Sequence, residues 1–154
     1  MSAKQKIWRQ GLILALLALF LLFLALHAWA GFQIKQLTKN NYYDSSPLIN
    51  ANGWVVWRGY VGSEIDGNWW IYVWKGEDSP IQITNNKYPG WRDYQINDNG
   101  WVVWQYSGIY LWKGGGNPIK ISDKYSDNSP QINANGWVVW QGYDGKDSEI
   151  YVWK

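Results

Sequence analysis

After residue 40 the chain consists of short apolar runs separated by polar turns. The run Trp-Val-Val-Trp occurs three times, beginning at Trp54, Trp101 and Trp137. Each copy follows a turn that ends in Asn-Gly, and these two residues tolerate the positive φ that a two-residue hairpin turn requires. We therefore expect each turn to join an incoming strand to the Trp-Val-Val-Trp strand.

Further apolar runs follow each copy of Trp-Val-Val-Trp. A run of the form Ile-Tyr-Val/Leu-Trp begins at Ile71, Ile109 and Ile150. After the first two of these comes a shorter run, at residues 81–84 and 119–122, each introduced by proline. The runs are rich in β-branched and aromatic residues, which favour strands. The repeat therefore predicts four short antiparallel strands.

The spacing of the repeats indicates an architecture. The three Trp-Val-Val-Trp runs begin at residues 54, 101 and 137, which are 47 and then 36 residues apart. One blade of a β-propeller takes about 40–50 residues, and four-stranded units arranged around an axis form such a propeller. The predicted fold is all-β, with propeller blades over about residues 44–84, 93–122 and 130–154.

The two ends of the repeat region are complementary. Residues 32–38, Phe-Gln-Ile-Lys-Gln-Leu-Thr, match the outermost strand of a blade, whereas the last repeat ends after three strands. We expect the N-terminal strand to complete the last blade. Closed propellers have about four to eight blades. Either two chains supply three blades each to a six-bladed ring, or the sequence is part of a longer propeller or an open array.

The repeats resemble a known family. The last repeat contains Ser129-Pro130, a turn ending in Asn135-Gly136, and the run Glu149-Ile150-Tyr151-Val152. Residues 37–38 and 83–84 give the Leu-Thr type of ending. These motifs resemble the TolB-type, WD-repeat-like β-propeller repeat, and the resemblance covers residues 32–154. It implies a propeller fold and no particular task. Asn in place of the turn Asp, Asp93-Tyr94 in place of Ser-Pro, and the many Trp residues depart from that repeat.

The first 30 residues form a separate segment. Lys4, Lys6 and Arg9 precede an uninterrupted apolar run from Leu12 to Leu26, and Ala28-Trp29-Ala30 has the small-x-small form of a cleavage site. This pattern predicts a hydrophobic helix that directs export, either as a signal peptide cut after Ala30 or as a retained membrane anchor using residues 12–32. Both interpretations place the repeats in the periplasm or outside the cell.

Charge and cysteine content restrict the partners and the sources of stability. The whole chain carries a net charge of +2, and residues 31–154 hold 11 basic against 12 acidic side chains. So weak a charge disfavours a nucleic-acid partner. The chain contains no cysteine, so disulfides do not stabilise the fold.

The chemistry available to the repeats is narrow. The one histidine, His27, lies in the export segment, so Ser-His-Asp and Cys-His arrangements and the usual zinc sites are excluded from the repeats. No loop acid recurs in all three repeats, and the cluster Asp144, Asp147 and Glu149 is interpreted as a hairpin turn instead of a calcium site. We expect no enzyme activity, no catalytic residues, no metal and no cofactor. The remaining loop acids are Asp44, Glu64 and Asp66.

Aromatic residues separate the two predicted loop faces. The face with the Asn-Gly turns has none, whereas the opposite face is rich in Tyr and Trp. An exposed ring offers a large apolar area and a polar edge at little entropic cost. Tyr42, Tyr88 and Tyr125 recur and are interpreted as packing between blades. The candidate ligand-binding residues are Trp69, Trp91, Tyr60, Tyr106, Tyr143 and Arg92.

The sequence thus favours an exported, non-enzymatic propeller that serves as a binding scaffold for a protein or a cell-surface glycan. Two other hypotheses remain open. The unpaired end strands could join chains into a homodimer or polymer by strand exchange. Alternatively, the chain is the N-terminal fragment of a larger propeller protein or hydrolase.

Overall fold

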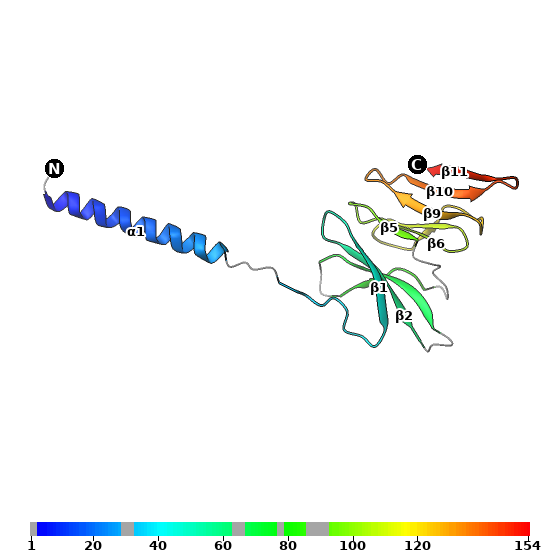
Figure 1. Cartoon of the computed structure of the whole chain (residues 1–154), viewed down its shortest axis with the longest axis horizontal. Helices are drawn as coiled ribbons and strands as arrows, with labels where there is room; N and C mark the ends of the chain where they lie inside the picture. Colours follow the sequence, from blue (N-terminus) through cyan, green and yellow to red (C-terminus); the bar gives the residue numbers. More distant parts are fainter. Residues whose placement is uncertain (1–2, 29–32, 63–66, 77–78, 86–92) are drawn as a thin grey trace. The chain divides into compact units, whose positions relative to one another are not determined.

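A computed structural model describes residues 3–28, 33–62, 67–76, 79–85 and 93–154 (Figure 1). One helix, α1 (Ala3–Ala28), precedes the strands, and residues 1–36 and 37–154 form separate compact units. The strands are β1 (Tyr43–Ile49), β2 (Val55–Val61), β3 (Asn68–Trp74), β4 (Ile81–Gln82), β5 (Tyr94–Ile96), β6 (Val102–Gln105), β7 (Ile109–Trp112), β8 (Ile119–Lys120), β9 (Asn128–Ile132), β10 (Val138–Tyr143) and β11 (Ser148–Trp153).

Helix α1 exposes a continuous set of apolar side chains between Leu12 and Leu21. No helix within the described ranges meets the length and hydropathy that a membrane span requires.

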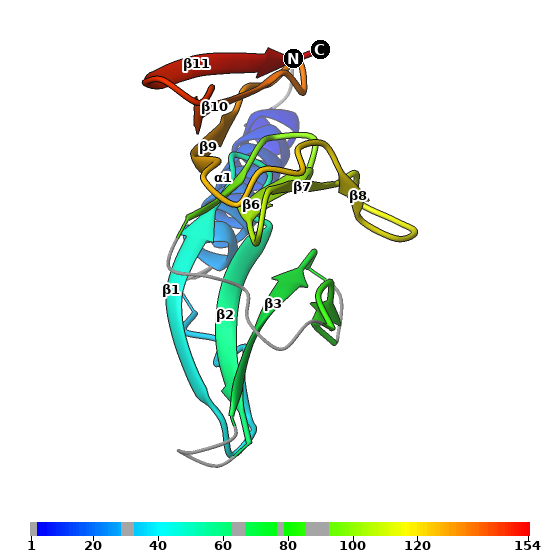
Figure 2. The same ribbon diagram turned by 90° about the vertical axis from the view of Figure 1, so that its right-hand side faces the viewer.

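Each repeat forms one antiparallel sheet, as the apolar pattern predicts. The first sheet has the order β1-β2-β3-β4, the second β5-β6-β7-β8, and the third β9-β10-β11. Neighbouring strands in each sheet are consecutive in the chain, so the sheets are simple meanders (Figure 2). The N-terminal helix, the all-β repeats and the three antiparallel sheets confirm this part of the prediction.

The Asn-Gly turns differ in detail from the expected two-residue turns. The Asn50 N–H donates to the Trp54 carbonyl at 3.1 Å, and the Gly53 N–H donates to the Asn50 carbonyl at 3.1 Å. Only Gly53 has positive φ, at 77°, so the turn is a three-residue loop with a glycine bulge. The Asn50 side chain favours this form because its Oδ1 accepts from the backbone N–H groups of Asn52 and Trp54.

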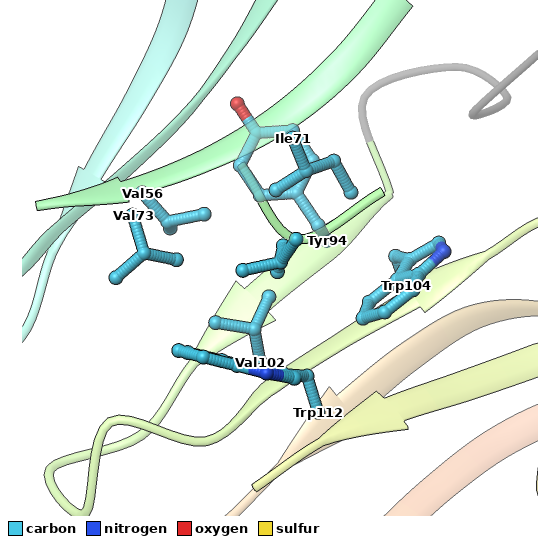
Figure 3. Packing of buried hydrophobic residues seen from close by; sticks show 8 residues of the cluster. Val56, Ile71, Val73, Tyr94, Val102, Trp104 and Trp112 are labelled. Carbon is cyan, nitrogen blue, oxygen red and sulfur yellow. The ribbon is translucent and has the colours of Figure 1, made fainter. Parts of the chain in front are cut away.

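The second sheet is buried on both faces, which explains the two adjacent valines in each repeat. Val56, Ile71 and Val73 of the first sheet pack against Val102 and Trp112 of the second (Figure 3). On the other face, three side chains of the second sheet pack against two of the third, and the residues are Val103, Ile109 and Leu111 against Val138 and Trp140. Successive residues of a strand point to opposite faces, so Val102 and Val103 serve different cores.

Three tryptophans at the strand positions belong to these cores, Trp104 and Trp112 to the first and Trp140 to the second. Trp57, Trp104 and Trp112 are less than 5% exposed. In each sheet the second Trp of Trp-Val-Val-Trp stacks on the Tyr of the neighbouring strand, with centroids 5.7–5.8 Å apart. The interpretation of the strand tryptophans as packing residues is confirmed for Trp57, Trp104, Trp112 and Trp140, whereas it is wrong for Trp137, which is 44% exposed.

The predicted N-terminal strand is wrong for this chain on its own. Residues 33–38 form no strand, Phe32 lies outside the described residues, and the third sheet has three strands. A strand depends on ladder hydrogen bonds to a neighbour. The outer edge of β11 has no neighbouring strand among the described residues, so the predicted pairing is not formed.

Candidate binding surface

The first sheet contains longer strands than the second, and this difference creates the candidate site. Strands β1, β2 and β3 have seven residues each, whereas β6 and β7 have four each. Tyr43 pairs with Tyr60, and Tyr60 pairs with Trp69, across the three long strands. We call Tyr43, Tyr60 and Trp69 the aromatic row. The register aligns their side chains on one sheet face, as in any directly opposed set.

The aromatic row is a closely packed cluster. The ring centroids of Tyr60 and Trp69 are 5.2 Å apart, and those of Tyr43 and Trp69 are 6.2 Å apart with the rings nearly perpendicular. A Cβ on Gly67 would lie 2.1 Å from the Tyr60 ring, so glycine at this position lets the ring lie against the backbone. Tyr43 is 70% exposed, and Tyr60 and Trp69 are partly exposed.

Arg58 adds a cation to this surface. Its Cζ lies 4.2 Å from the centroid of the Trp69 ring, and its Nε donates to Ser45 Oγ at 3.0 Å. A guanidinium over an indole is attracted by the negative face of the ring. The Ser45 bond and the ring contact together hold the guanidinium in place beside the row.

The structure assigns the candidate residues to different places. Tyr60 and Trp69 meet in the aromatic row, and they belong to strands β2 and β3 instead of the expected loop, because the hairpin ladder continues to Val61 and Asn68. Trp91 and Arg92 lie outside the described residues.

The two other predicted tyrosines do not join the row. Tyr106 is partly buried, packs against the core between the first and second sheets, and contacts Tyr110 at 6.3 Å between centroids. Tyr143 ends β10 in the third sheet, and it is 45% exposed. Tyr106 therefore has a packing role in the structure.

The recurring tyrosines also differ from the prediction. Tyr125 is 82% exposed and Tyr42 is 45% exposed, while Tyr88 lies outside the described residues. The interpretation that they pack between sheets is wrong for Tyr125. The buried residue of this segment is Asp127, which is 2% exposed.

The candidate list missed Tyr43 and Arg58. The strand register could have identified Tyr43. Tyr43 lies opposite Tyr60 because the turn at residues 50–53 is a three-residue loop and because β1 contains a bulge further along. That bulge falls between Ser45 and Leu48, where Ser46 has a φ of 55°. Sequence alone does not locate it.

A groove between the outer strands of the first and second sheets is a weaker candidate. It has a volume of about 550 Å³ and lies beside residues 81–85 and 114–118. Its aromatic lining comes from Trp104, Tyr110 and Trp112, and both tryptophans are less than 5% exposed. Rings already buried in the core offer little surface to a ligand.

The clustered acids of the third sheet form a turn. Asp144, Asp147 and Glu149 bring carboxylate oxygens within 4.8 Å of one another, and all three are exposed. Asp144 Oδ1 accepts the backbone N–H groups of Lys146 at 2.7 Å and Asp147 at 3.1 Å. The pKa of Asp144 is lowered by these bonds. Glu64 and Asp66 lie outside the described residues.

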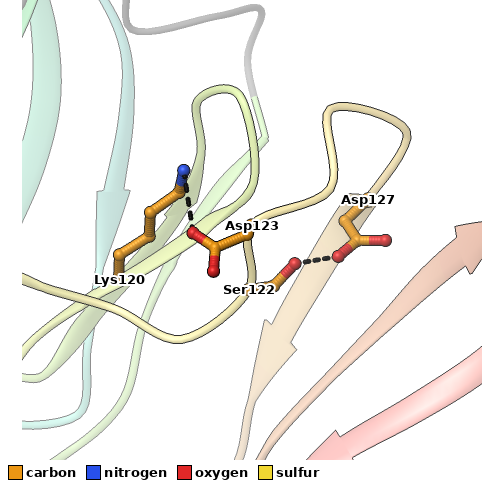
Figure 4. A network of polar contacts seen from close by, with 4 residues as sticks. All are labelled: Lys120, Ser122, Asp123 and Asp127. Carbon is orange, nitrogen blue, oxygen red and sulfur yellow. Dashed lines mark hydrogen bonds and ion pairs between the residues drawn. The ribbon is translucent and has the colours of Figure 1, made fainter.

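A buried carboxyl connects the second and third sheets. Ser122 Oγ donates to Asp127 Oδ2, and Lys120 pairs with the exposed Asp123 at 3.2 Å (Figure 4). Burial raises the pKa of Asp127, against the lowering effects of Trp140 and Lys124. Asp127 Oδ1 and Trp140 Nε1 are buried without a hydrogen-bond partner of normal geometry. This arrangement belongs to the packing between sheets and not to the aromatic row.

Comparison of the chain with protein-family models, with curated proteins and with solved structures finds no match.

Proposed function

We propose that this protein is an exported, non-enzymatic scaffold built of propeller-type blades, and that it binds a cell-surface glycan through the aromatic row. The export step rests on the basic start, the apolar run and the Ala-x-Ala site of residues 1–30. The propeller-type blade rests on the repeated four-strand meander and on the resemblance to TolB-type repeats.

The observation that carries the proposal is the aromatic row with Arg58. Three rings from adjacent strands and one guanidinium lie on a single sheet face, within 6.2 Å of Trp69. The apolar C–H face of a sugar ring packs on an aromatic ring, and sugar hydroxyls accept from a fixed guanidinium. Because sheet strands are rigid, such a platform loses little entropy on binding.

Glycan-binding assays on the full chain test the proposal, with mild detergent present because α1 exposes apolar side chains. Trp69→Ala should weaken binding to a responsive polysaccharide by at least about tenfold, since aromatic contacts dominate such sites. Tyr125→Ala is the matched control, because Tyr125 is exposed but lies outside the row. Trp91→Ala and Arg92→Ala enter the same assay as candidates predicted from the sequence.

Unchanged binding by folded Trp69→Ala would reject the aromatic row as the site. If the wild type binds no glycan but an extracellular protein binds it in a Trp69-dependent manner, the row is a protein-binding surface and the glycan proposal fails.

A further inference from the structure

The sheets contact each other through a repeated set of interactions, beginning with tryptophan on glycine. Trp54 of the first sheet covers Gly100 of the second, so that a Cβ on Gly100 would lie 1.9 Å from the Trp54 ring. Trp101 of the second sheet covers Gly136 of the third in the same way, with a corresponding distance of 2.5 Å. In both cases the first Trp of Trp-Val-Val-Trp reaches the Asn-Gly turn of the next sheet.

The asparagine turns repeat a second interaction. Asn50 Nδ2 donates to the Asn97 carbonyl at 2.9 Å, and Asn97 Nδ2 donates to the Asn133 carbonyl at 2.9 Å. Each amide therefore connects its own turn to the turn of the following sheet. Both bonds run in the same direction along the chain.

Lysine supplies a third repeated contact. Lys75 Nζ lies 4.8 Å from the ring centroids of Trp54 in its own sheet and of Trp112 in the next. Lys113 Nζ lies 4.8 Å from Trp101 and 4.9 Å from Trp153 in the corresponding way. The rule that joins successive sheets is thus the same at both junctions.

The third sheet presents the same interacting groups to solvent. Trp137, which corresponds to Trp54 and Trp101, is 44% exposed, and Lys154 Nζ lies 4.4 Å from its centroid. Asn133 Nδ2 has no hydrogen-bond partner among the described residues, although its Oδ1 accepts from the Trp137 N–H. The third sheet therefore has the Trp, Asn and Lys side chains that reach the next sheet at the two internal junctions, but no sheet follows it among the described residues.

The apolar side chains of this face are exposed only in the third sheet. Ile150 is 76% exposed, whereas the corresponding Ile71 and Ile109 are 2% and 0% exposed. Val152 is 53% exposed, whereas Val73 and Leu111 are both 0% exposed. Val139 shows the same difference, being 38% exposed where Val56 and Val103 are fully buried. Such a patch is normally an interaction surface.

The first sheet exposes the surface that, in the second and third sheets, is covered by the preceding sheet. A Cβ on Gly53 would meet nothing within 4 Å, whereas the corresponding Gly100 and Gly136 are covered by tryptophan. Ile49 is 70% exposed, whereas the corresponding Ile96 and Ile132 pack against the cores between sheets. Unit 37–154 therefore ends in two different faces that match each other.

We propose that the third sheet of one chain binds the first sheet of a second copy, by the rule that joins the sheets within the chain. Trp137 then covers Gly53 of the second copy, and Asn133 Nδ2 donates to its Asn50 carbonyl. The interface is head-to-tail, and two chains that close on each other give six sheets, within the range of about four to eight for closed propellers. This inference does not depend on the aromatic row.

The same docking supplies the missing fourth strand. Residues 81–84 lie along β3 and precede the second sheet in the sequence. The Ile83 N–H donates to the Ile71 carbonyl at 2.9 Å, and the Ile71 N–H donates to Thr84 Oγ1 at 2.9 Å. Residues 35–38 have the corresponding place before the first sheet and also end in threonine. When the first sheet of a second copy docks, its residues 35–38 lie along β11, with Leu37 and Thr38 facing Ile150.

The register of this pairing gives a direct test. Val73 pairs with Ile81 and Leu111 pairs with Ile119, so Val152 should pair with Lys35 of the second copy. The chain has no cysteine. Full-length Val152→Cys and Lys35→Cys proteins are mixed in mild detergent and oxidised. A disulfide heterodimer is expected, and Tyr125→Cys in place of Val152→Cys should give at least about tenfold less, because no pairing brings it near residue 35.

Gly53→Ala, introduced into the Lys35→Cys chain, should lower the heterodimer yield by about tenfold, because the new Cβ meets Trp137 of the second copy. Gly116→Ala is the matched control, since Gly116 also has positive φ and open space around its Cβ position. A heterodimer yield equal to that of Tyr125→Cys, or one unaffected by Gly53→Ala, would overturn the proposal. So would a double variant, Lys35→Cys with Val152→Cys, that forms only an intramolecular disulfide.

Discussion

Asn97 shows at a single position how the first asparagine of a turn joins neighbouring sheets. Its Oδ1 accepts from the Trp101 N–H at 2.9 Å, which aspartate could also do. Its Nδ2 donates to the Asn133 carbonyl, which aspartate could not do. Asn97 is 5% exposed, so both bonds are shielded from water. The amide of Asn97 therefore joins its own turn to the turn of the next sheet, which a carboxylate could not do.

Asn97→Asp should reduce the free energy of unfolding by about 1–3 kcal/mol, because it removes the buried hydrogen bond from Asn97 to the Asn133 carbonyl and places a carboxylate beside that carbonyl. Urea unfolding of dilute protein at pH 7 measures this value. Asn133→Asp is the control, since Asn133 Nδ2 has no partner within the described chain and Asn133 is exposed. Equal losses in the two variants would contradict the role of the amide.

Tyr94 gives a prediction about pH. Its hydroxyl donates to the Ser46 carbonyl across the junction of the first and second sheets, and burial raises its pKa to about 12, against the opposing effect of Arg58. The folded pKa lies above the unfolded value of about 10, so the folded state holds the proton more tightly. The stability due to this group is complete below pH 10 and is lost as the pH rises towards 12.

Unfolding free energies measured from pH 9 to pH 12 should therefore fall more steeply for the wild type than for Tyr94→Phe. Phenylalanine keeps the ring but has no proton to lose, so this part of the pH dependence disappears. Parallel curves would show that the Tyr94 hydroxyl does not titrate abnormally.

At the scale of elements, strand register and strand length produce features that individual residues do not reveal. The aromatic row exists because three seven-residue strands are paired so that Tyr43, Tyr60 and Trp69 lie opposite one another. The same register that buries Val56 on the face towards the second sheet places Arg58 and Tyr60 further along that face. A shift by one residue would move the row to the other side.

Strands β7 and β11 have the same sequence pattern but different surroundings, and their amide exchange should differ. Ile109 and Leu111 are fully buried between sheets, whereas Ile150 and Val152 lie on an edge strand. In dilute protein, hydrogen exchange measured by mass spectrometry should be at least about tenfold slower for β7 than for β11. Equal protection at concentrations where light scattering finds monomers would contradict the exposed edge.

At the scale of the whole molecule, each of the three sheets contains the same set of inter-sheet contact residues. In the described chain, this set contacts a following sheet in two of the three cases. The two internal junctions use tryptophan on glycine, asparagine on carbonyl and lysine between tryptophans. The exposed Trp137 of the third sheet and the uncovered Gly53 of the first sheet are the two parts of this contact that have no partner sheet among the described residues. A heterologous interface of this kind closes into a ring when the rotation between units permits, and otherwise propagates.

Docking of a second copy makes thermal stability depend on concentration, because a partner that binds only the folded chain stabilises it by mass action. The melting temperature of the wild type should rise by several degrees between micromolar and submillimolar protein. Gly53→Ala should melt at the same temperature across this range, while Gly116→Ala should retain the dependence. A wild-type melting temperature independent of concentration would contradict docking.

Much of the architecture could be predicted from the residues in order. The Trp-Val-Val-Trp repeats, the Asn-Gly turns and the Ile-Tyr runs predicted three antiparallel sheets after one helix, because strand propensity and turn chemistry are local properties. The prediction that the strand tryptophans are packing residues is confirmed for Trp104, Trp112 and Trp140 and is wrong for Trp137. Of the six candidate site residues, Tyr60 and Trp69 lie together in the structure, whereas their neighbours Tyr43 and Arg58 were not among the candidates.

Only the tertiary structure decided which of the repeated residues are covered. Ile71, Ile109 and Ile150 are equivalent in sequence, yet the first two are buried and the third is 76% exposed. The order of residues determines what each sheet can bind on its two faces, since that depends on side-chain type and strand alternation. Burial is set by whether another sheet lies against the face, and residues 33–38 belong to none of the strands in the described sheets.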